Sequence, residues 1–296
     1  MKVLLLGCNG QVGWELQRSL APLGELTALD HDSPEHLADF SRPEAVAETV
    51  RRLRPDVIVN AAAHTAVDKA ESEEAFARTL NATTPAAIAS VAHELGALMV
   101  HYSTDYVFDG SGARPWLESD APGPLSVYGH TKLDGERQVA QQCPNHLIFR
   151  TSWVYAARGG NFAKTMLRLA RERERLTVID DQFGAPTGAE LLADVTAHAV
   201  RATLADRAKA GLYHVVASGE THWHGYARFV LQQAEAAGLS LKASSERVDA
   251  VPTSAFPTPA RRPHNSRLNT DKFQRTFGLV LPPWQAGVAR MLRETL

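Results

Sequence analysis

The first thirty residues contain the pattern that most narrowly constrains the fold of this chain. Residues 3–6 are apolar, and residues 2–6 predict a buried strand. The turn after them and the start of the next helix contain three glycines: Gly7, Gly10 and Gly13. Residues 25–29 predict a second strand, which ends at Asp30. Strand, glycine turn, helix, strand and acid in this order are typical of a dinucleotide-binding unit. Its helix N-terminus binds a pyrophosphate, and its acid takes the ribose hydroxyls.

The alternation of strands and helices continues through the first half of the chain. Residues 42–53 predict a helix. Further strands are predicted at 56–60, 97–102 and 146–150. Strands that alternate with helices imply a parallel sheet with right-handed crossovers. We therefore expect an α/β protein with a Rossmann-type, doubly wound parallel sheet and a smaller C-terminal substrate-binding part.

The less regular second half suggests how the chain is divided. Residues 1–152 would form mainly the dinucleotide-binding domain. Residues 153–296 would form mainly the substrate-binding part, interleaved with the last pieces of the sheet. Within it, residues 162–174 predict an amphipathic helix, and residues 180–188 predict a loop.

Composition narrows the class of protein. Of the 296 residues, 44% are hydrophobic and 22% are charged, as expected for a soluble globular protein. The formal net charge of −2, without a long run of one sign, argues against nucleic-acid or membrane binding through bulk charge. The apolar run at the N-terminus is too short to span a bilayer. The only cysteines, Cys8 and Cys143, lack metal-type spacing, so we expect a cytoplasmic protein.

A Tyr-x-x-x-Lys sequence, Tyr128 to Lys132, is the strongest indication of a catalytic site in this chain. On a helix, residues four apart share one face, so the phenol and the ammonium would point the same way. A nearby cation favours the phenolate and lowers the pKa of the tyrosine. Such a pair can pass a proton to or from a carbonyl or alcohol oxygen. The spacing is common by chance, and its meaning depends on the rest of the chain.

Two strand ends carry residues suited to a ligand. Thr104 and Asp105 follow the predicted strand 97–102, and polar side chains at the carboxyl end of a parallel strand are well placed for chemistry. The strand at 56–60 runs into three small residues: Ala61, Ala62 and Ala63. These could let a ligand approach the backbone or could only allow tight helix packing. We interpret the neighbouring His64 as a polar loop residue.

Taken together, the motifs resemble a known enzyme family. The glycine turn, Ser103-Thr104-Asp105 and the Tyr128–Lys132 pair are similar to those of the extended short-chain dehydrogenase/reductases. Three further stretches narrow the resemblance to the dTDP-4-dehydrorhamnose reductase family: Ser152-Trp153-Val154-Tyr155, Asp181-Gln182-Phe183-Gly184-Ala185-Pro186-Thr187 and Arg262-Pro263-x-x-Ser266-x-Leu268. The resemblance covers nearly the whole chain. It implies NADH- or NADPH-dependent reduction of dTDP-4-dehydro-L-rhamnose to dTDP-L-rhamnose, a nucleotide-sugar precursor of cell-surface polysaccharide.

The resemblance also implies roles for individual residues. The catalytic set would be Thr104, Tyr128 and Lys132. Tyr128 would give its proton to the ketone oxygen, and Lys132 would also bind the nicotinamide ribose. Cofactor binding would further involve Gly7, Gly10, Gln11, Val12, Asp30, Asp39, Phe40, Ala61, Ala62 and Ala63. The substrate would contact Thr104, Asp105 and Trp153.

A metal site and a homodimer are further implications. Some members of the family are homodimers bridged by Mg²⁺ through glutamates, and the matching positions are Glu15, Glu190 and Glu294. These could also be ordinary surface acids, because the family itself varies. One position departs from the expected motif, since His130 replaces a lysine that is often found there. It lies two residues from Tyr128 and hence off the catalytic face of a helix.

Two alternatives stay open from the sequence. The chain could be another nucleotide-sugar epimerase or dehydratase of the same superfamily, although Asp105 lacks the adjacent glutamate of a dehydratase acid pair. It could also be a non-catalytic regulatory subunit similar to that of methionine adenosyltransferase, against which the intact catalytic set argues. The choice between NADH and NADPH is also open, because Asp30 would repel a 2′-phosphate and His31 could offset the repulsion.

Overall fold

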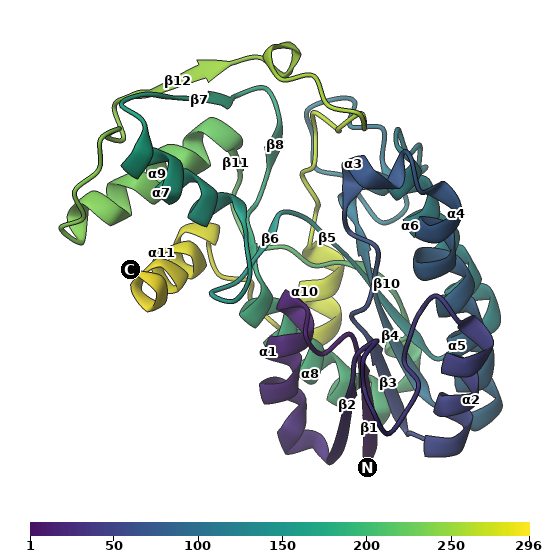
Figure 1. Cartoon of the computed structure of the whole chain (residues 1–296). Coiled ribbons are helices and arrows are strands. Elements are labelled where there is room, and N and C mark those ends of the chain that lie inside the picture. Colours follow the sequence, from purple (N-terminus) through teal and green to yellow (C-terminus); the bar gives the residue numbers. More distant parts are fainter.

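A six-stranded parallel sheet forms the centre of the computed structural model, which describes all residues, 1–296 (Figure 1). Its strands are β1 (Lys2–Leu6), β2 (Glu25–Leu29), β3 (Val57–Asn60), β4 (Leu98–Thr104), β5 (His146–Thr151) and β10 (Gly211–His214). The strand order is β10-β5-β4-β3-β1-β2, and every neighbouring pair is parallel. Since β1 lies between β2 and β3, the crossover direction changes at β1 and the sheet is doubly wound. The predicted α/β class and Rossmann-type sheet are confirmed.

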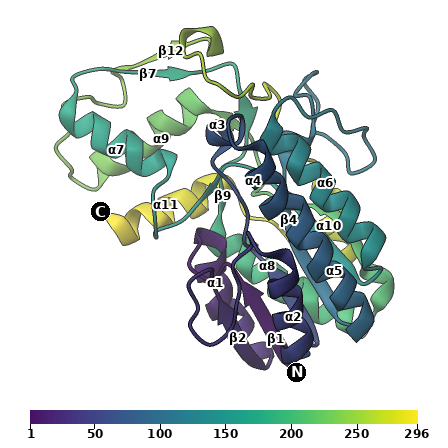
Figure 2. The same cartoon turned by 45° about the vertical axis from the view of Figure 1, so that its right-hand side comes forward.

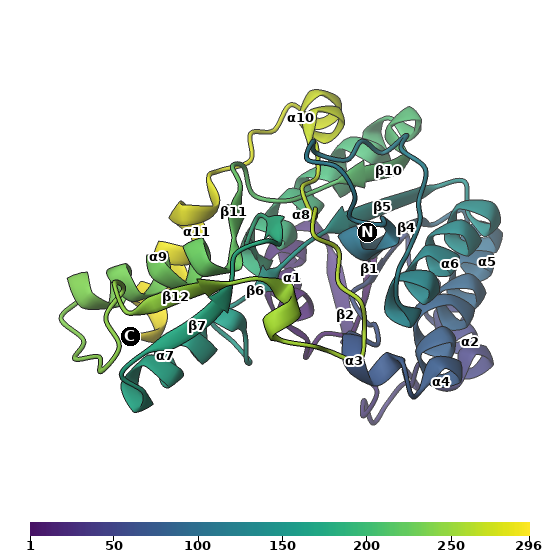
Figure 3. The same ribbon diagram turned by 90° about the horizontal axis from the view of Figure 1, so that it is seen from above.

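Alternate residues of the strands supply two separate cores, one on each face of the sheet. Val3 and Leu5 belong to one core, and Leu4 and Leu6 belong to the other. The first core is completed by α1 (Gln11–Leu20), α8 (Ala189–Ala205) and α10 (Asp271–Phe277). The second is completed by α2 (Pro43–Leu53), α5 (Thr84–Leu95) and α6 (Val127–Gln142). Figure 3 shows α2, α5 and α6 together on one side of the sheet and α1 and α8 on the other. Burial on both faces explains the continuous apolar runs of these strands.

A third core lies within the smaller part of the chain, whose helices stand apart from the central sheet in Figure 2. Three helices build it: α7 (Phe162–Glu172), α9 (Trp223–Ala236) and α11 (Trp284–Thr295). A two-stranded parallel sheet of β7 (Leu176–Ile179) and β12 (Val248–Val251) packs on them. The buried side chains of this third core include Tyr226 and Trp284, whose rings meet edge to face with their centres 5.8 Å apart.

Short strands connect the two parts. The segment predicted as a loop at residues 180–188 contains two of them, β8 (Phe183–Gly184) and β9 (Thr187–Gly188). They pair with β11 (Thr221–His222) and β6 (Val154–Tyr155), which are distant in the sequence. Each strand has only two residues, so no periodic pattern could have indicated it.

The remaining helical segments are short. They are α3 (Val67–Ala70), α4 (Glu74–Arg78), a π-helical turn (Thr79–Thr83) and 3₁₀ turns at Ala21–Leu23, Asp105–Val107, Arg207–Lys209 and Thr253–Ala255. None of the helices combines the length and the apolar character needed to span a bilayer.

Candidate active site

A cleft of about 760 Å³ opens at the carboxyl ends of the central strands. Every residue that the sequence predicts for the cofactor, the substrate or catalysis lines this cleft. They are Gly7, Gly10, Gln11, Val12, Asp30, Asp39, Phe40, Ala61, Ala62, Ala63, Thr104, Asp105, Tyr128, Lys132 and Trp153. The carboxyl ends of parallel strands meet at one edge, which brings these residues together from segments that are far apart in the chain.

The glycine turn holds β1, α1 and β3 in close contact. A Cβ atom on Gly13 would lie 1.9 Å from the Gly7 carbonyl oxygen, and one on Gly7 would lie 2.6 Å from the Ala62 nitrogen. Gly7 also has a φ of 82°, a left-handed conformation that only glycine adopts without strain. No side chain caps the N-terminus of α1. Its first N–H groups, at Gln11 and Val12, are therefore available to a phosphate.

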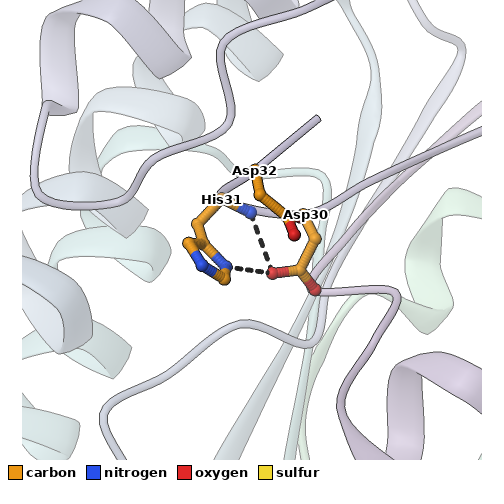
Figure 4. A group of neighbouring side chains, drawn as sticks. All are labelled: Asp30, His31 and Asp32. Atoms are coloured by element: carbon orange, nitrogen blue, oxygen red, sulfur yellow. Dashed lines mark hydrogen bonds and ion pairs between the residues drawn. The ribbon is translucent and has the colours of Figure 1, made fainter. Parts of the chain in front are cut away.

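Asp30 lies at the other side of the turn, at the end of β2, and its carboxylate is held by three donors, of which Figure 4 shows the two from His31. Oδ2 accepts a hydrogen bond from the Asn9 N–H at 2.9 Å, and Oδ1 accepts one from the His31 N–H at 2.8 Å. The His31 ring nitrogen Nδ1 lies 2.7 Å from the same Oδ1. Burial alone would raise the pKa of Asp30, but these hydrogen bonds outweigh it and lower the pKa below its usual value. The carboxylate is therefore ionised at neutral pH.

Lys132 is held beneath the cleft by α6. Ser126 caps this helix, its Oγ accepting a hydrogen bond from the Gly129 N–H at 3.2 Å. One turn later the Lys132 side chain is only 2% exposed, and its Nζ donates to the Tyr102 carbonyl oxygen at 2.6 Å. Burial lowers the pKa of Lys132 to about 8, with the nearby Glu136 acting in the opposite direction. The ammonium is thus fixed in place and still mainly charged at neutral pH.

Tyr128 presents its phenol from the same face of α6. Its ring meets that of Tyr106 edge to face at 5.5 Å. Burial raises the pKa of the phenol well above its usual value, while the neighbouring Thr104 hydroxyl lowers it. The expected lowering by Lys132 is wrong for this arrangement, because the Lys132 ammonium is bound to a carbonyl and desolvation of the phenol dominates. Tyr128 therefore keeps its proton at neutral pH and can serve as an acid.

Thr104 connects the phenol to a buried carboxyl group. Its hydroxyl donates to Asp105 Oδ1 at 3.0 Å and accepts from the Tyr106 N–H at 3.2 Å. Asp105 is 2% exposed, and burial raises its pKa to about 6 although hydrogen bonds from Ser266 and Thr104 oppose this. Asp105 Oδ2 has no hydrogen-bond partner within the chain. A polar ligand can therefore find an unused acceptor next to Thr104.

Trp153 forms part of the opposite wall, in a strained backbone conformation. Its φ of 49° is unusual for a residue with a side chain, and such strain is often found at functional sites. The indole stacks on Trp223 with ring centres 3.7 Å apart. Gly184 makes room for it, since a Cβ atom there would lie 2.9 Å from Trp153 Cε2. The two stacked indoles give the cleft a flat apolar surface.

Trp223 and Arg262 are among the cleft residues to which the sequence assigned no role. Trp223 lies seventy residues beyond Trp153, with no local sign of their contact. Arg262 is part of the motif that carries the family resemblance, and that motif was the one available signal. Its Nη2 donates to Asp68 Oδ2 at 2.7 Å, while its buried Nε has no partner. The guanidinium can therefore accept a further anionic or carbonyl ligand from the cleft.

The predicted metal ligands lie outside the cleft, where α1, α8 and α11 approach one another. Burial raises the pKa of Glu190, the neighbouring charges of Glu15 and Glu294 raise it further, and Arg290 opposes the shift. Glu294 Oε1 lies 3.2 Å from Arg290 Nε. The three carboxylates are thus neighbours, but within one chain their oxygens are not close enough to share one ion.

Comparisons with known proteins agree with this arrangement. The chain matches the family described as "RmlD substrate binding domain" over residues 1–296. It is 66% identical, over 99% of its length and 98% of the relative's, to a dTDP-4-dehydrorhamnose reductase of Shigella flexneri.

Two solved structures share the whole fold. The crystal structure of a dTDP-4-dehydrorhamnose reductase from Clostridium acetobutylicum superposes with a TM-score of 0.89 at 34% identity, covering 99% of each chain. The structure of the Bacillus anthracis enzyme in complex with NADP superposes with a TM-score of 0.86 at 33% identity, again over 99% of each chain.

Proposed function

This chain belongs to the dTDP-4-dehydrorhamnose reductase family, and from that premise we propose that it reduces the 4-keto group of dTDP-4-dehydro-L-rhamnose to dTDP-L-rhamnose with NADH or NADPH. The observation that carries the proposal is the arrangement of Tyr128, Lys132 and Thr104 at one end of a cleft that begins at the glycine turn. A protonated phenol beside a fixed ammonium is suited to completing the reduction of a carbonyl group.

The chain's own residues fit a nicotinamide dinucleotide. The uncapped start of α1 suits the pyrophosphate, and Gly13 lets this helix lie directly against the Gly7 backbone. The ionised Asp30 suits the adenosine ribose. Lys132 would hold the other ribose. When bound, the cofactor supplies the hydride for the reaction, and the relative solved with NADP supports this choice of cofactor.

Tyr128 would give its proton to the oxygen of the reduced ketone. Its raised pKa keeps the phenol protonated at rest, and the Thr104 hydroxyl, which acts to lower that pKa, would stabilise the phenolate that the transfer leaves behind. The Thr104 hydroxyl would hold the reacting oxygen next to the phenol. A proton on the phenol and a hydride from the cofactor together convert the ketone into an alcohol.

The remaining wall of the cleft would bind the nucleotide sugar. The stacked indoles of Trp153 and Trp223 suit a sugar or base face, and the buried Nε of Arg262 suits a phosphate oxygen. Residues 153–296 would thereby supply most of the substrate-binding part, and residues 1–152 most of the dinucleotide-binding domain. The half-buried carboxylate of Glu190, which feels the like charges of Glu15 and Glu294, supports Mg²⁺ binding between the subunits of a homodimer.

Turnover is the direct test. Enzymatically prepared dTDP-4-dehydro-L-rhamnose should be consumed with stoichiometric oxidation of NADH or NADPH, and NMR of the product should show the rhamno configuration at C4. An epimerase would interconvert sugars without net cofactor oxidation. A regulatory subunit would show no turnover and would co-purify with a partner enzyme. Either result would refute the proposed reaction.

A further inference from the structure

The apolar wall formed by the two stacked indoles is held from behind by a buried amide. Gln182 lies between β7 and β8, is 4% exposed and does not line the cleft. The indole Nε1 of Trp223 donates to Gln182 Oε1 at 3.1 Å. Trp223 in turn stacks on Trp153, with the two ring planes 16° apart. The amide is thus the polar partner of a ring whose flat face lies against the indole predicted to contact the sugar.

The orientation of this amide is fixed at its other end. Gln182 Nε2 donates to the Thr253 hydroxyl at 3.0 Å, and this hydroxyl donates to Asp181 Oδ1 at 2.5 Å. The Thr253 N–H also donates to Asp181 Oδ2, at 2.9 Å. Burial would raise the pKa of Asp181, but the hydrogen bonds from Thr253 lower the pKa below its usual value, so this group is an ionised acceptor.

Donor and acceptor chemistry allows only one arrangement of this hydrogen-bonded chain from Asp181 to Trp223. A carboxylate can only accept, so the Thr253 hydroxyl donates its proton to Asp181 and offers a lone pair to the amide NH₂ group. An indole N–H can only donate, so the amide oxygen must face Trp223. An amide at position 182 satisfies both ends, whereas a carboxylate of the same length satisfies one end and an apolar side chain satisfies neither.

The same chain joins three segments of the substrate-binding part. Gln182 precedes β8, Trp223 begins α9, and Thr253 begins the 3₁₀ turn that follows β12. From this turn the backbone passes toward α3, where the Arg262 guanidinium donates to Asp68 (Figure 1). Gln182 therefore lies where the segment that carries one indole meets the segment that leads to the cleft arginine.

From this geometry we propose that Gln182 is a positioning residue of the sugar site, which holds the indole of Trp223, and through it that of Trp153, in the orientation that receives the nucleotide sugar. The inference rests on the proposed function, since the wall belongs to the same site. Trp153 has a strained φ of 49° and depends on its surroundings to keep its place. A ring that is already fixed loses little freedom when the sugar binds, so the effect of Gln182 falls on sugar affinity and not on the chemical step.

Removal of both polar ends of Gln182 tests this role. Gln182→Met keeps the length of the side chain but can neither accept from the indole nor donate to Thr253. The KM of dTDP-4-dehydro-L-rhamnose and the dissociation constant of dTDP-L-rhamnose, measured by calorimetry, should each rise roughly fivefold, the size of one hydrogen bond. We expect kcat to stay close to the wild-type value. The dissociation constant of NADPH, measured without sugar, should not change.

Gln182→Glu provides a pH-dependent version of the same test. The ionised carboxylate can accept from the indole but cannot donate to Thr253, whereas the protonated carboxyl group can do both. The ratio of the variant's sugar KM to the wild-type KM should be near one at about pH 5 and rise above the usual glutamate pKa, because burial and a neighbouring carboxylate favour the protonated form. Asp180, His222 and His264, the other titratable groups near this chain, are the same in both proteins, so their effects cancel in the ratio.

Rescue at Thr253 separates positioning from a general loss of stability. Thr253→Ser keeps the hydroxyl and should keep the wild-type sugar KM, whereas Thr253→Val removes the hydroxyl and should raise it. Gln274→Met is the matched control, because Gln274 Nε2 makes the same bond to a threonine hydroxyl, Thr270 Oγ1 at 3.0 Å, but lies outside the cleft. It should reproduce the wild-type constants.

Two results would overturn the inference or the reaction on which it rests, and they can be told apart. If Gln182→Met, shown to be folded by circular dichroism, keeps the wild-type sugar KM and product affinity, Gln182 does not position the indoles. If the wild type binds dTDP-L-rhamnose without reductase turnover, the proposed reaction is refuted, and the product affinities of the variants still test the role of Gln182. If the wild type binds no dTDP sugar, both proposals fail.

Discussion

Removal of the Tyr128 hydroxyl tests the proposed reaction most sharply. Tyr128→Phe takes away one oxygen and keeps the ring, whose edge-to-face contact with Tyr106 at 5.5 Å should survive. General acid catalysis contributes typically ~10²–10⁴-fold, which corresponds to roughly 3–5 kcal/mol of barrier. We expect the loss in kcat, with little change in the dissociation constant of the sugar, because the phenol acts in the transition state.

The structure also predicts how this loss depends on pH. With the phenol gone, the nearest remaining acid is Asp105, which contacts Thr104 and has a pKa raised to about 6 by burial. A carboxyl group gives up a proton only in its protonated form, so the residual activity of Tyr128→Phe should rise as the pH falls through about 6. In Tyr128→Phe with Asp105→Asn, this rise should disappear.

Single-turnover kinetics and calorimetric sugar binding would measure both effects. Tyr213→Phe is a matched control, because its hydroxyl donates to the Lys209 carbonyl oxygen outside the cleft. Thr104→Val should cost less than Tyr128→Phe, since it leaves the acid in place. A folded Tyr128→Phe protein with near-normal kcat would refute the assignment of Tyr128 as the acid.

Four further changes have definite expected outcomes. Asp30→Asn should shift the ratio of kcat/KM values toward NADPH, and an unchanged ratio would mean that Asp30 does not face the ribose. Lys132→Met should weaken the binding of both cofactors alike, as measured by calorimetry. In the wild type the affinity should fall as the pH rises through about 8, where Lys132 loses its proton, and the variant should not show this fall. Gly13→Ala should lower the free energy of unfolding by at least ~1–3 kcal/mol in urea titrations, since the new Cβ would meet the Gly7 carbonyl, whereas Gly160→Ala, with open space around it, should not. EDTA should shift the protein from dimer to monomer in sedimentation without lowering kcat of the subunit, and an unchanged oligomer would exclude a bridging Mg²⁺.

Local patterns were sufficient to predict the part of the fold that positions the cofactor site. The strands expected at residues 97–102 and 146–150 correspond to β4 (Leu98–Thr104) and β5 (His146–Thr151). Buried parallel strands are continuous apolar runs, so they are visible without an alignment. Once the strands are known, their carboxyl ends must meet, and the residues that follow them must share one cleft. This is why residues as distant as Gly10 and Lys132 could be assigned to one site.

Features that depend on contacts between distant segments could not be predicted in this way. The stacking of Trp223 on Trp153 requires the start of α9 to lie beside the segment that follows β5, and no spacing in the sequence encodes that contact. The two-residue strands β8 and β9 exist only because β11 and β6 lie beside them. The sixth strand, β10, follows from neither the glycine turn nor the Tyr128 motif, although its place beside β5 extends the sheet.

The pKa of Tyr128 shows why a motif identifies a pair of residues but not the balance of forces between them. Spacing places the phenol and the ammonium on one helix face, and from that alone the lysine should lower the pKa of the tyrosine. In the folded chain the Lys132 ammonium is bound to the Tyr102 carbonyl, and burial of the phenol is the larger effect. A phenol that keeps its proton at rest is prepared to reduce a ketone, whereas a resting phenolate would be prepared to oxidise an alcohol. The surroundings of the phenol, which only the folded structure reveals, therefore decide that Tyr128 rests as a proton donor.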